Sequence, residues 1–402
     1  MHDRPTLLNI LNQLENWMEG EAFRGWDPHD ALNSPLLKRL AVNRALGILL
    51  LQTVKCSPVN LRRLLGVPKG INPKALGLML SAYAVRFQST GDPTDRAKID
   101  RCAAELLASP LPRSPASSLP RLAWGYNFDW PNRAFYAPKG TPTIVTTAFI
   151  GLGFLDAYRA TGASAFLDVA ESAARFMLHD LKVTQHAEGT SSSYTPLDNS
   201  IIYNANMLSA AFLAEVGSLT GAVAYTEAAE SRTAFALSRQ RADGSWPYGE
   251  AWNQRWVDSF HTGYSLLALH SMASLTGDKR YTSALERGYA FYLDHFFLSD
   301  GRVKYEAHRA AAGHRVGDRP PACAYPFDAH AFACAMICLK RLREFDRRSD
   351  STLAKVVRST LDLFWSGEGY FYAKRGRIFT DKTPYMRWVQ AWVFRALVEL
   401  LF

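Results

Sequence analysis

A stretch of sequence recurs along this chain, and this repeat constrains the fold more than any other feature. Each copy is an apolar run rich in Ala, Gly and Ser that ends in the dipeptide Thr-Gly. The dipeptides begin at Thr161, Thr220 and Thr276, at intervals of 59 and 56 residues. Two shorter copies without the dipeptide cover residues 329–342 and 388–401. Self-similarity at a fixed spacing predicts a repeat architecture in which each copy is one structural unit.

Each repeat predicts a pair of helices followed by a turn. The first helix is apolar almost all round, so we expect it to be buried on every side. The glycine after the threonine suits the left-handed position that ends a helix. A more amphipathic outer helix follows in each repeat, at residues 164–179, 222–240, 279–297 and 352–365. A short segment with glycine and aromatic residues then predicts a β-hairpin, at residues 243–248, 300–305 and 367–372.

Helix pairs that bury their faces only against neighbouring pairs must stack or close. The simplest solution is an all-α fold: an (α/α) toroid or barrel of repeated helix pairs over residues 120–402, with short β-hairpins at one end. Residues 1–115 form an N-terminal helical segment that either supplies ring members or acts as a cap. Its helices are expected at about 4–19, 33–52, 73–92 and 95–108. Residues 109–120, rich in Pro and Ser, are the expected linker.

The balance of charges narrows the class of partner. The chain has 46 Lys and Arg against 37 Asp and Glu, a formal net charge of +9, and such a field attracts anions. We therefore expect an anionic polysaccharide or a lipid-linked oligosaccharide as the partner. Nucleic acid is not expected, because the sequence has no zinc-finger, RRM or helix-turn-helix signature. Aromatic residues make up 12% of the chain and are frequent in turns, where they stack on sugars or pack beneath connections.

The sequence favours a cytoplasmic location. It contains neither a signal-peptide core nor an apolar run long enough to cross a bilayer. The five cysteines are scattered, without a Cys-x-x-Cys pair, and do not indicate a disulfide framework. Peripheral contact with the inner face of the membrane stays open, because Arg62 and Arg63 stand beside apolar residues. A homodimer also stays open.

The turns that lead into the inner helices hold the candidate functional residues. In a ring of helix pairs these turns lie at one end, where helix N-termini add partial positive charge. Asp198, Asp258 and Asp328 occupy similar places in three repeats. Each is either an N-cap that accepts backbone N–H groups or a residue of the site, and both interpretations stay open.

One histidine in these turns is a candidate for acid–base chemistry. His261 lies three residues after Asp258 and shares a helix face with it. A histidine oriented by a carboxylate acts as a general acid or base near neutral pH; the alternative is that it only contacts its own cap. With Tyr264, these two residues are catalytic candidates. The other residues of these turns are expected to bind substrate: Asp129, Trp130, Arg133, Tyr194, Asp198, Asn199, Tyr203, Asn204, Trp246, Tyr248, Arg255, Trp256, Asp328, His330, Tyr385 and Trp388.

No motif indicates a metal ion or a cofactor. The sequence has no HExxH or Cys-pair spacing for a metal and no Gly-rich loop for a phosphate. It also lacks the GxSxG turn of a serine nucleophile. We therefore expect neither a metal nor a cofactor.

The segment Gln240-Arg-Ala-Asp-Gly-Ser-Trp246 resembles the Gln-to-Trp repeat of terpene-cyclase and prenyltransferase toroids. Those cyclases carry an Asp-rich DxDD acid motif or a diphosphate-binding DDxxD motif, and neither occurs here. The resemblance therefore supports the ring and not the reaction.

Residues 120–402 are similar, in the order of their motifs, to the C-terminal domain of glucuronyl C5-epimerases. The shared order is Gly-Ser-Trp246-Pro, an inner helix opening near Tyr264, Tyr325-Pro, a late hairpin with glycine and tyrosine at Gly369–Tyr372, and Arg387-Trp388. That family is an (α/α) toroid that inverts C5 of glucuronate within a polysaccharide. The resemblance implies acid–base chemistry at Tyr370 or Tyr372 and a catalytic role for Arg387. The sequence departs from the family's Tyr-His, since Gln390 and Trp392 follow instead.

We therefore expect an enzyme of polysaccharide biosynthesis or modification that acts on a uronic-acid-containing glycan, specifically a glucuronyl C5-epimerase. Removing the C5 proton builds negative charge on the neighbouring carboxylate, which a cation such as Arg255 or Arg387 would face. The alternatives on the same toroid are a polysaccharide lyase and a glycoside hydrolase that pairs Asp198 with Asp258 or Asp328. A non-catalytic glycan-binding or scaffold subunit of a synthesis complex also stays open.

Overall fold

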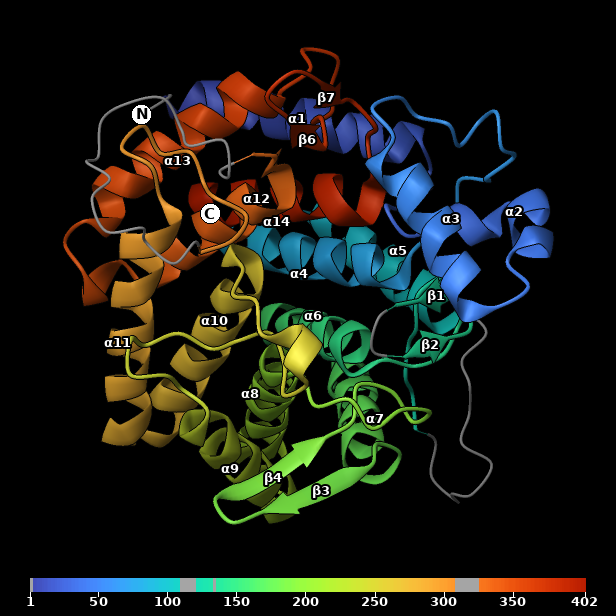
Figure 1. Cartoon of the computed structure of the whole chain (residues 1–402). Coiled ribbons are helices and arrows are strands. Elements are labelled where there is room, and N and C mark those ends of the chain that lie inside the picture. The colour runs from blue at the N-terminus through green and yellow to red at the C-terminus, as the bar shows by residue number, and fades with distance from the viewer. Residues whose placement is uncertain (1–2, 109–120, 133–134, 308–324) are drawn as a thin grey trace.

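The computed structural model describes residues 3–108, 121–132, 135–307 and 325–402 (Figure 1). The α-helices are α1 (Arg4–Gly20), α2 (Pro35–Leu40), α3 (Arg44–Cys56), α4 (Pro73–Thr90), α5 (Pro93–Ala108), α6 (Ile144–Thr161), α7 (Ser164–His179), α8 (Tyr203–Thr220), α9 (Val223–Ser238), α10 (Ser259–Thr276), α11 (Lys279–Phe296), α12 (Ala329–Arg341), α13 (Ser349–Phe364) and α14 (Ala391–Leu401). A π-helical turn at Met386–Gln390 leads into α14. The strands are β1 (Trp130–Pro131), β2 (Tyr136–Ala137), β3 (Val183–His186), β4 (Gly189–Ser192), β5 (Phe327–Asp328), β6 (Lys374–Arg375) and β7 (Thr380–Asp381).

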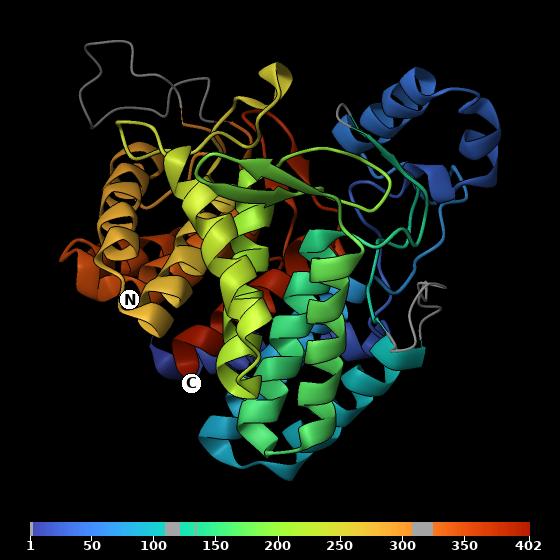
Figure 2. The ribbon, with the colours of Figure 1, turned by 90° about the horizontal axis from the view of Figure 1, so that it is seen from below.

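The inner helices close a ring. Helices α4, α6, α8, α10, α12 and α14 each pack on the next, and α14 packs back on α4. An outer helix covers each inner one: α5, α7, α9, α11 and α13 follow their partners in sequence, whereas α1 covers α14 (Figures 1 and 2). The expected (α/α) toroid is confirmed. Because α1, α4 and α5 belong to residues 1–115, this segment supplies members of the ring.

Small residues allow the inner helices to pack closely. A Cβ atom on Gly153 of α6 would lie 2.6 Å from the carbonyl oxygen of Gly77 on α4, and one on Gly151 would lie 2.3 Å from the Phe212 ring of α8. The expected left-handed caps are also present, since Gly162, Gly221 and Gly277 have φ of 70°, 73° and 67°. Gly91 after Thr90 ends α4 in the same way, with φ of 69°.

Two local predictions differ from the structure. The helix expected over 33–52 is wrong: α2 and α3 are separate, and the Asn43 side chain caps α3 by accepting the backbone N–H of Leu46. The expected hairpins after the outer helices are tight turns closed by isolated bridges, such as Phe297 with Val303. Regular hairpin pairing occurs instead between β3 and β4 and between β6 and β7. The expected linker, residues 109–120, lies outside the described residues.

Residues 31–70, here called the arm, lie to one side of the ring. The arm contains α2 and α3 and has a small core of its own, formed by Ala31, Leu32, Leu37, Leu51 and Val54. It contacts β1 through α3, and Figures 1 and 2 show both helices at the edge of the molecule. Over the described ranges, no helix combines the length and the apolar character needed to cross a membrane.

Candidate functional site

A pocket of about 580 Å³ lies at the end of the ring where the inner helices begin. The second residue after the N-cap of every inner helix lines it: Lys74, Val145, Asn204, Phe260, His330 and Arg387. The arm and the β1–β2 region supply further lining residues. Six helix N-termini therefore converge on this pocket, and their partial positive charges favour an anionic group there.

A buried carboxylate orients a histidine on the α10 side of the pocket. Asp258 caps α10, with one oxygen accepting the His261 backbone N–H at 2.9 Å. Its other oxygen lies 2.7 Å from His261 Nδ1 and accepts the Trp256 indole N–H at 3.0 Å. An acceptor at Nδ1 favours the tautomer that carries its hydrogen there. The Nε2 atom of His261 is then left as a proton acceptor.

A second histidine is held in place from both sides. His330 Nδ1 donates to the Trp388 carbonyl at 2.9 Å, and its Nε2 accepts the Tyr264 hydroxyl at 2.6 Å. The Trp388 indole stacks on the His330 ring, with centroids 4.4 Å apart. Burial lowers the pKa of His330 well below its usual value. Both ring nitrogens are therefore occupied, and the ring is neutral.

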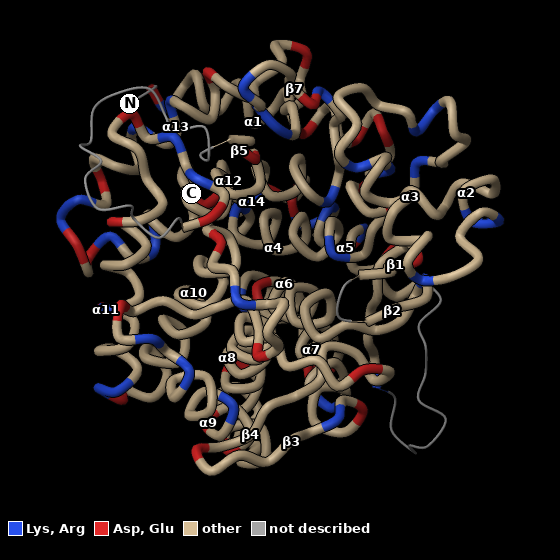
Figure 3. Tube along the Cα trace, viewed as in Figure 1, with Lys and Arg blue, Asp and Glu red and all other residues tan. Residues whose placement is uncertain are grey.

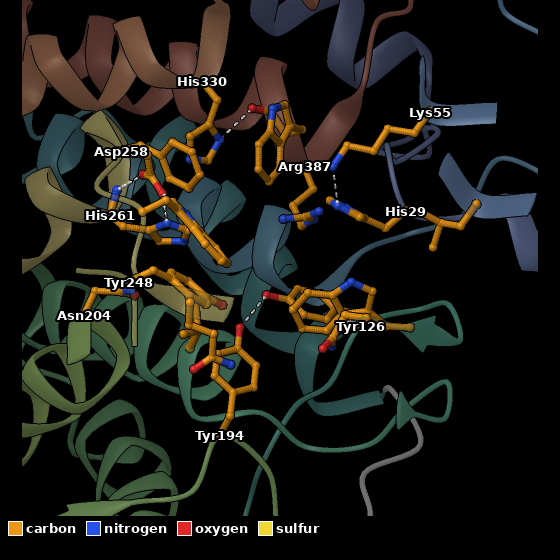
Figure 4. Close-up of a pocket in the computed structure, with 18 of the residues that line it drawn as sticks. His29, Lys55, Tyr126, Tyr194, Asn204, Tyr248, Asp258, His261, His330 and Arg387 are labelled. Carbon is orange, nitrogen blue, oxygen red and sulfur yellow. Dashed lines mark hydrogen bonds and ion pairs between the residues drawn. The ribbon is translucent and has the colours of Figure 1, made fainter. Parts of the chain in front are cut away.

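The arm side of the pocket carries a lysine and a third histidine. Lys55 Nζ lies 3.0 Å from His29 Nε2, and His29 Nδ1 lies 3.4 Å from Asp27, which holds Arg387 through two hydrogen bonds. Burial and then the charge of Lys374 lower the pKa of Lys55 to about 8. Burial and then the charge of Lys55 lower the pKa of His29 to about 3. Figure 4 shows Lys55 and His29 across the pocket from His261, with Arg387 between them.

Lys74 places an amine among aromatic rings. Its Nζ lies 4.2 Å from the ring centroid of Phe149, 5.3 Å from that of Tyr264 and 5.4 Å from that of Trp392. Burial, followed by the charge of Arg387, lowers the pKa of Lys74 well below its usual value. The three rings lie at distances at which a protonated amine would make cation–π contacts, whereas burial favours the neutral amine.

Aromatic side chains form the remaining walls. Tyr248 stacks on Trp256, with centroids 4.6 Å apart, and Tyr126 stacks on Phe128 at 5.2 Å. Flat apolar faces of this kind suit the C–H faces of a sugar ring. Asn204 adds a buried donor, because its Nδ2 has no hydrogen-bond partner among the described residues. An unsatisfied buried amide is costly, so this atom favours a ligand with an acceptor group.

Many of the predicted site residues do meet in this pocket. They come from different repeats, and the lining includes Trp130, Tyr194, Asn204, Tyr248, Trp256, Asp258, His261, Tyr264, His330, Arg387 and Trp388. The idea that polar groups converge where the inner helices begin therefore agrees with the geometry for these residues.

Three buried residues of the predicted set serve the scaffold instead. Asp198 does not line the pocket: its carboxylate folds its own loop by accepting the backbone N–H groups of Thr195 and Ser200. Asp328 caps α12 and accepts the indole N–H of Trp388, so it supports the pocket from behind. Trp246 is buried against the outer helices α9 and α11, and its indole N–H donates to the Ala236 carbonyl of α9.

Other predicted residues also lie outside the pocket lining. Asn199 and Arg255 are exposed. Asp129 pairs with Lys38, and Tyr203 donates to Glu250. The remaining two aromatic residues are also engaged elsewhere: Tyr385 accepts from Arg62, and Tyr372 packs beside Tyr370. The acid–base role for Tyr372 does not agree with this position. Arg133 lies outside the described residues.

His29, Lys55 and Lys74 were not among the predicted site residues. The signal for Lys74 was present, because Thr90-Gly91 ends α4 as the same dipeptide ends the other repeats. Counting back along that copy places Lys74 two residues after the cap, in the position of His330 on α12. His29 and Lys55 come from segments outside the repeat, so the repeat held no signal for them.

No protein-family model matches this chain, and no curated protein matches it either. Solved structures are similar to it. The cellobiose 2-epimerase of Bacillus thermoamylovorans matches with a TM-score of 0.63 and 11% identity, covering 84% of this chain and 90% of that one. The chain has the (α/α) toroid fold. A cellobiose 2-epimerase of Spirochaeta thermophila matches with a TM-score of 0.60 and 13% identity over 82% of this chain and 85% of that one.

An unsaturated glucuronyl hydrolase specific for heparin matches with a TM-score of 0.56 and 13% identity, covering 83% of this chain and 87% of that chain. At such identities the likeness concerns the fold alone. Over the described part of the chain, no group of three or more His, Cys, Asp or Glu side chains is placed to hold a metal ion.

Proposed function

We propose that this protein is a carbohydrate epimerase that moves a proton at a sugar carbon next to a carboxylate or carbonyl group. One observation carries the proposal: His261, oriented by the buried Asp258, and Lys55 lie on opposite sides of one aromatic-walled pocket (Figure 4). Inversion at carbon needs a base on one face and an acid on the other. The two groups meet this requirement.

In the proposed reaction His261 Nε2 takes the proton from the sugar carbon. The electron pair of the broken C–H bond forms a carbon–carbon double bond, and the electrons of the neighbouring C=O bond move onto oxygen, which gives an enediolate. Lys55 Nζ then gives a proton to the opposite face of that carbon. The electron pair of the carbon–carbon double bond forms the new C–H bond, and the oxygen re-forms the C=O bond. The histidine ends protonated and the lysine neutral, and exchange with solvent restores both.

The electrostatics of the pocket favour an anionic intermediate. Lys55 and Arg387 line the pocket, and the charge of Arg387 is partly compensated by Asp27 behind it. These cations and the helix N-termini favour negative charge on the reacting group. Among the described lining residues the only acidic side chains are Asp258 and Glu306. A glycoside hydrolase develops positive charge on its sugar ring and uses two carboxylates. The proposed partners of Asp258 in that reaction, Asp198 and Asp328, lie outside the lining, so the hydrolase alternative has less support.

The specific form we propose is C5 epimerisation of glucuronate in a glycan. Its support is the cationic pocket, the net charge of +9 and the aromatic walls, which fit a polyanionic sugar chain. A second candidate is C2 epimerisation at a reducing end. Its support is the likeness in fold to two proteins named cellobiose 2-epimerases. The C2 proton of an open-chain aldose also lies next to a carbonyl group.

The test is incubation in heavy water with a glucuronate polymer and, separately, with a reducing disaccharide. Nuclear magnetic resonance then reports deuterium at each sugar carbon. Deuterium at C5 of the uronate supports the specific form, and deuterium at C2 of the disaccharide supports the second candidate. Release of shortened sugars without deuterium, or an unsaturated product that absorbs in the ultraviolet, would replace the epimerase with a hydrolase or a lyase.

A further inference from the structure

The arm has an unusual composition for a surface segment. Between Ala31 and Gly70 the sequence has seven Lys and Arg residues and no Asp or Glu. This stretch therefore contributes +7 of the formal net charge of +9. Figure 3 shows Lys and Arg positions along the tube around α2 and α3. Most of the excess positive charge of the molecule is thus concentrated at one edge.

Part of this charge is compensated by carboxylates from outside the arm. Arg62 pairs with Asp30, Lys38 with Asp129 and Lys69 with Glu21. Arg39, Arg44 and Arg63, in contrast, are exposed and belong to none of the ion pairs among the described residues. Arg44 already donates to the Asn132 carbonyl through Nε and Nη2. The exposed guanidinium groups of Arg39 and Arg63 are available to an anionic surface.

The same segment exposes apolar side chains. Of the sixteen large apolar side chains that are exposed in the described residues, six belong to the arm, with exposed fractions from 50% to 84%: Leu36, Leu40, Val42, Leu49, Val59 and Leu64. Single exposed leucines need no explanation. A concentration of them in a tenth of the chain, beside unpaired arginines, marks an interaction surface.

We infer that the arm docks on the surface of a membrane that contains anionic lipids. Arginines bind the phosphate and carboxylate groups of the lipid heads, and leucine and valine side chains insert between the acyl chains, as in interfacial helices. The exposed apolar residues of the arm are aliphatic, whereas single-stranded nucleic acids are bound by aromatic stacking. A symmetric contact between two copies would bring the unpaired arginines together, and their repulsion opposes a dimer through this face.

Docking of the arm fixes where the pocket lies relative to the membrane surface. Helix α3, which carries Leu49 on its exposed side, lines the pocket with Leu51, Gln52 and Lys55. A docked arm therefore holds the pocket close to the lipid head groups, where a sugar attached to a lipid would be within reach. The docking itself does not depend on the proposed epimerase function.

The test measures how the whole chain partitions onto vesicles by co-sedimentation. One set of vesicles contains phosphatidylcholine alone, and the other contains phosphatidylglycerol as well. Binding to the anionic vesicles is expected to be stronger by at least about tenfold, because each basic residue near the surface contributes about a fivefold factor. Added salt should weaken it. Equal binding to both kinds of vesicle, or none to either, overturns the inference.

Matched variants assign the binding to the arm. Arg39→Ser with Arg63→Ser should lower the partition coefficient roughly 25-fold, as expected for two basic residues. Leu36→Ser with Leu40→Ser should lower it about tenfold or more through lost apolar burial. The controls change exposed residues on the ring: Arg343→Ser with Arg347→Ser, and Val223→Ser with Leu275→Ser. They should bind like the unchanged chain.

Two further measurements test the alternative partners of the arm, which are a second copy of the chain and a nucleic acid. Each variant is expected to fold, because every substituted position is exposed, and thermal unfolding checks this. Size-exclusion chromatography and a nucleic-acid binding assay follow the same variants. If the apolar variant converts a dimer to a monomer, or the arginine variant loses nucleic acid while vesicle binding stays unchanged, the membrane assignment is wrong.

Discussion

The two sides of the pocket differ in origin and in chemistry. His261 and His330 stand at the start of repeated inner helices, and hydrogen bonds fix their orientation. Lys55 and His29 come from residues outside the repeat, and burial changes their pKa values. The difference indicates a division of labour. The repeated helices of the ring provide an oriented base, and the arm provides an acid, Lys55, with a pKa of about 8.

The largest expected effect concerns the base. His261→Ala should lower kcat by about 10³-fold, because a positioned general base contributes on the order of 10² to 10⁴ in rate. Deuterium uptake by the sugar in heavy water measures this loss. The matched control is His270→Ala, in the same helix but outside the pocket lining, which should keep its activity. Equal losses in both variants would mean that α10 is disturbed as a whole.

The next effect concerns the acid on the opposite side. Lys55→Gln should lower kcat by about 10²-fold. The protonated amine is the active form and its pKa is about 8, so the rate of the unchanged enzyme should fall as pH rises through that value. The variant should lose this alkaline limb, whereas Lys279→Gln on the exposed outer ring should retain it. If the rate of the Lys55 variant still falls as pH rises through about 8, another group gives the proton to the sugar carbon.

A smaller effect tests whether residues 1–115 are part of the ring. Gly153→Ala forces a Cβ atom against the Gly77 carbonyl of α4, at 2.6 Å. Overpacking of this kind lowers the free energy of unfolding by about 1 to 3 kcal/mol. Gly20→Ala is the control, because a Cβ there meets no atom within 4 Å, and it should leave stability unchanged or slightly higher. Denaturant unfolding that ranks the two variants alike would contradict the close packing of α4 on α6.

The smallest effect concerns stability and pH on the arm side. The pKa of His29 is about 3 in the folded chain, against 6.5 for a histidine in solvent. Between these pH values the unfolded chain therefore binds one more proton than the folded chain. Its contribution to stability is present above pH 6.5 and is lost as pH falls toward 3. Between about pH 7.5 and 5.5 this loss is roughly 1 kcal/mol. His29→Gln should reduce the loss by that amount, and identical slopes would show that His29 is charged in the fold.

The ring could be predicted from the sequence because each buried inner helix needs the same apolar pattern rich in small residues. This pattern therefore recurs at a regular spacing along the chain. Apolar helices ending at Thr161, Thr220 and Thr276 can only be buried by neighbours of the same kind. The same period located His261 and His330 at one end. The same period extends to Lys74, because Thr90-Gly91 ends α4 as this dipeptide ends the other repeats.

Other parts of the site could not be predicted in this way. Asp198, Asp258 and Asp328 look alike in the sequence, yet only Asp258 lines the pocket. The difference lies in local hydrogen bonds, such as those that Asp198 accepts within its own loop. Lys55 and His29 reach the pocket through tertiary contacts between segments that are distant in the sequence. Such contacts leave no repeated pattern along the chain from which they could be predicted.

The most direct test of the two-sided site follows deuterium in heavy water during the first turnovers, starting separately from each epimer of the sugar. With His261 and Lys55 on opposite faces, the new hydrogen comes from the group that did not take the old one. Deuterium should therefore appear in the product epimer while the remaining substrate stays unlabelled, in both directions. Early deuterium in both the substrate and the product pools would mean that one group serves both faces, and would contradict the division between ring and arm.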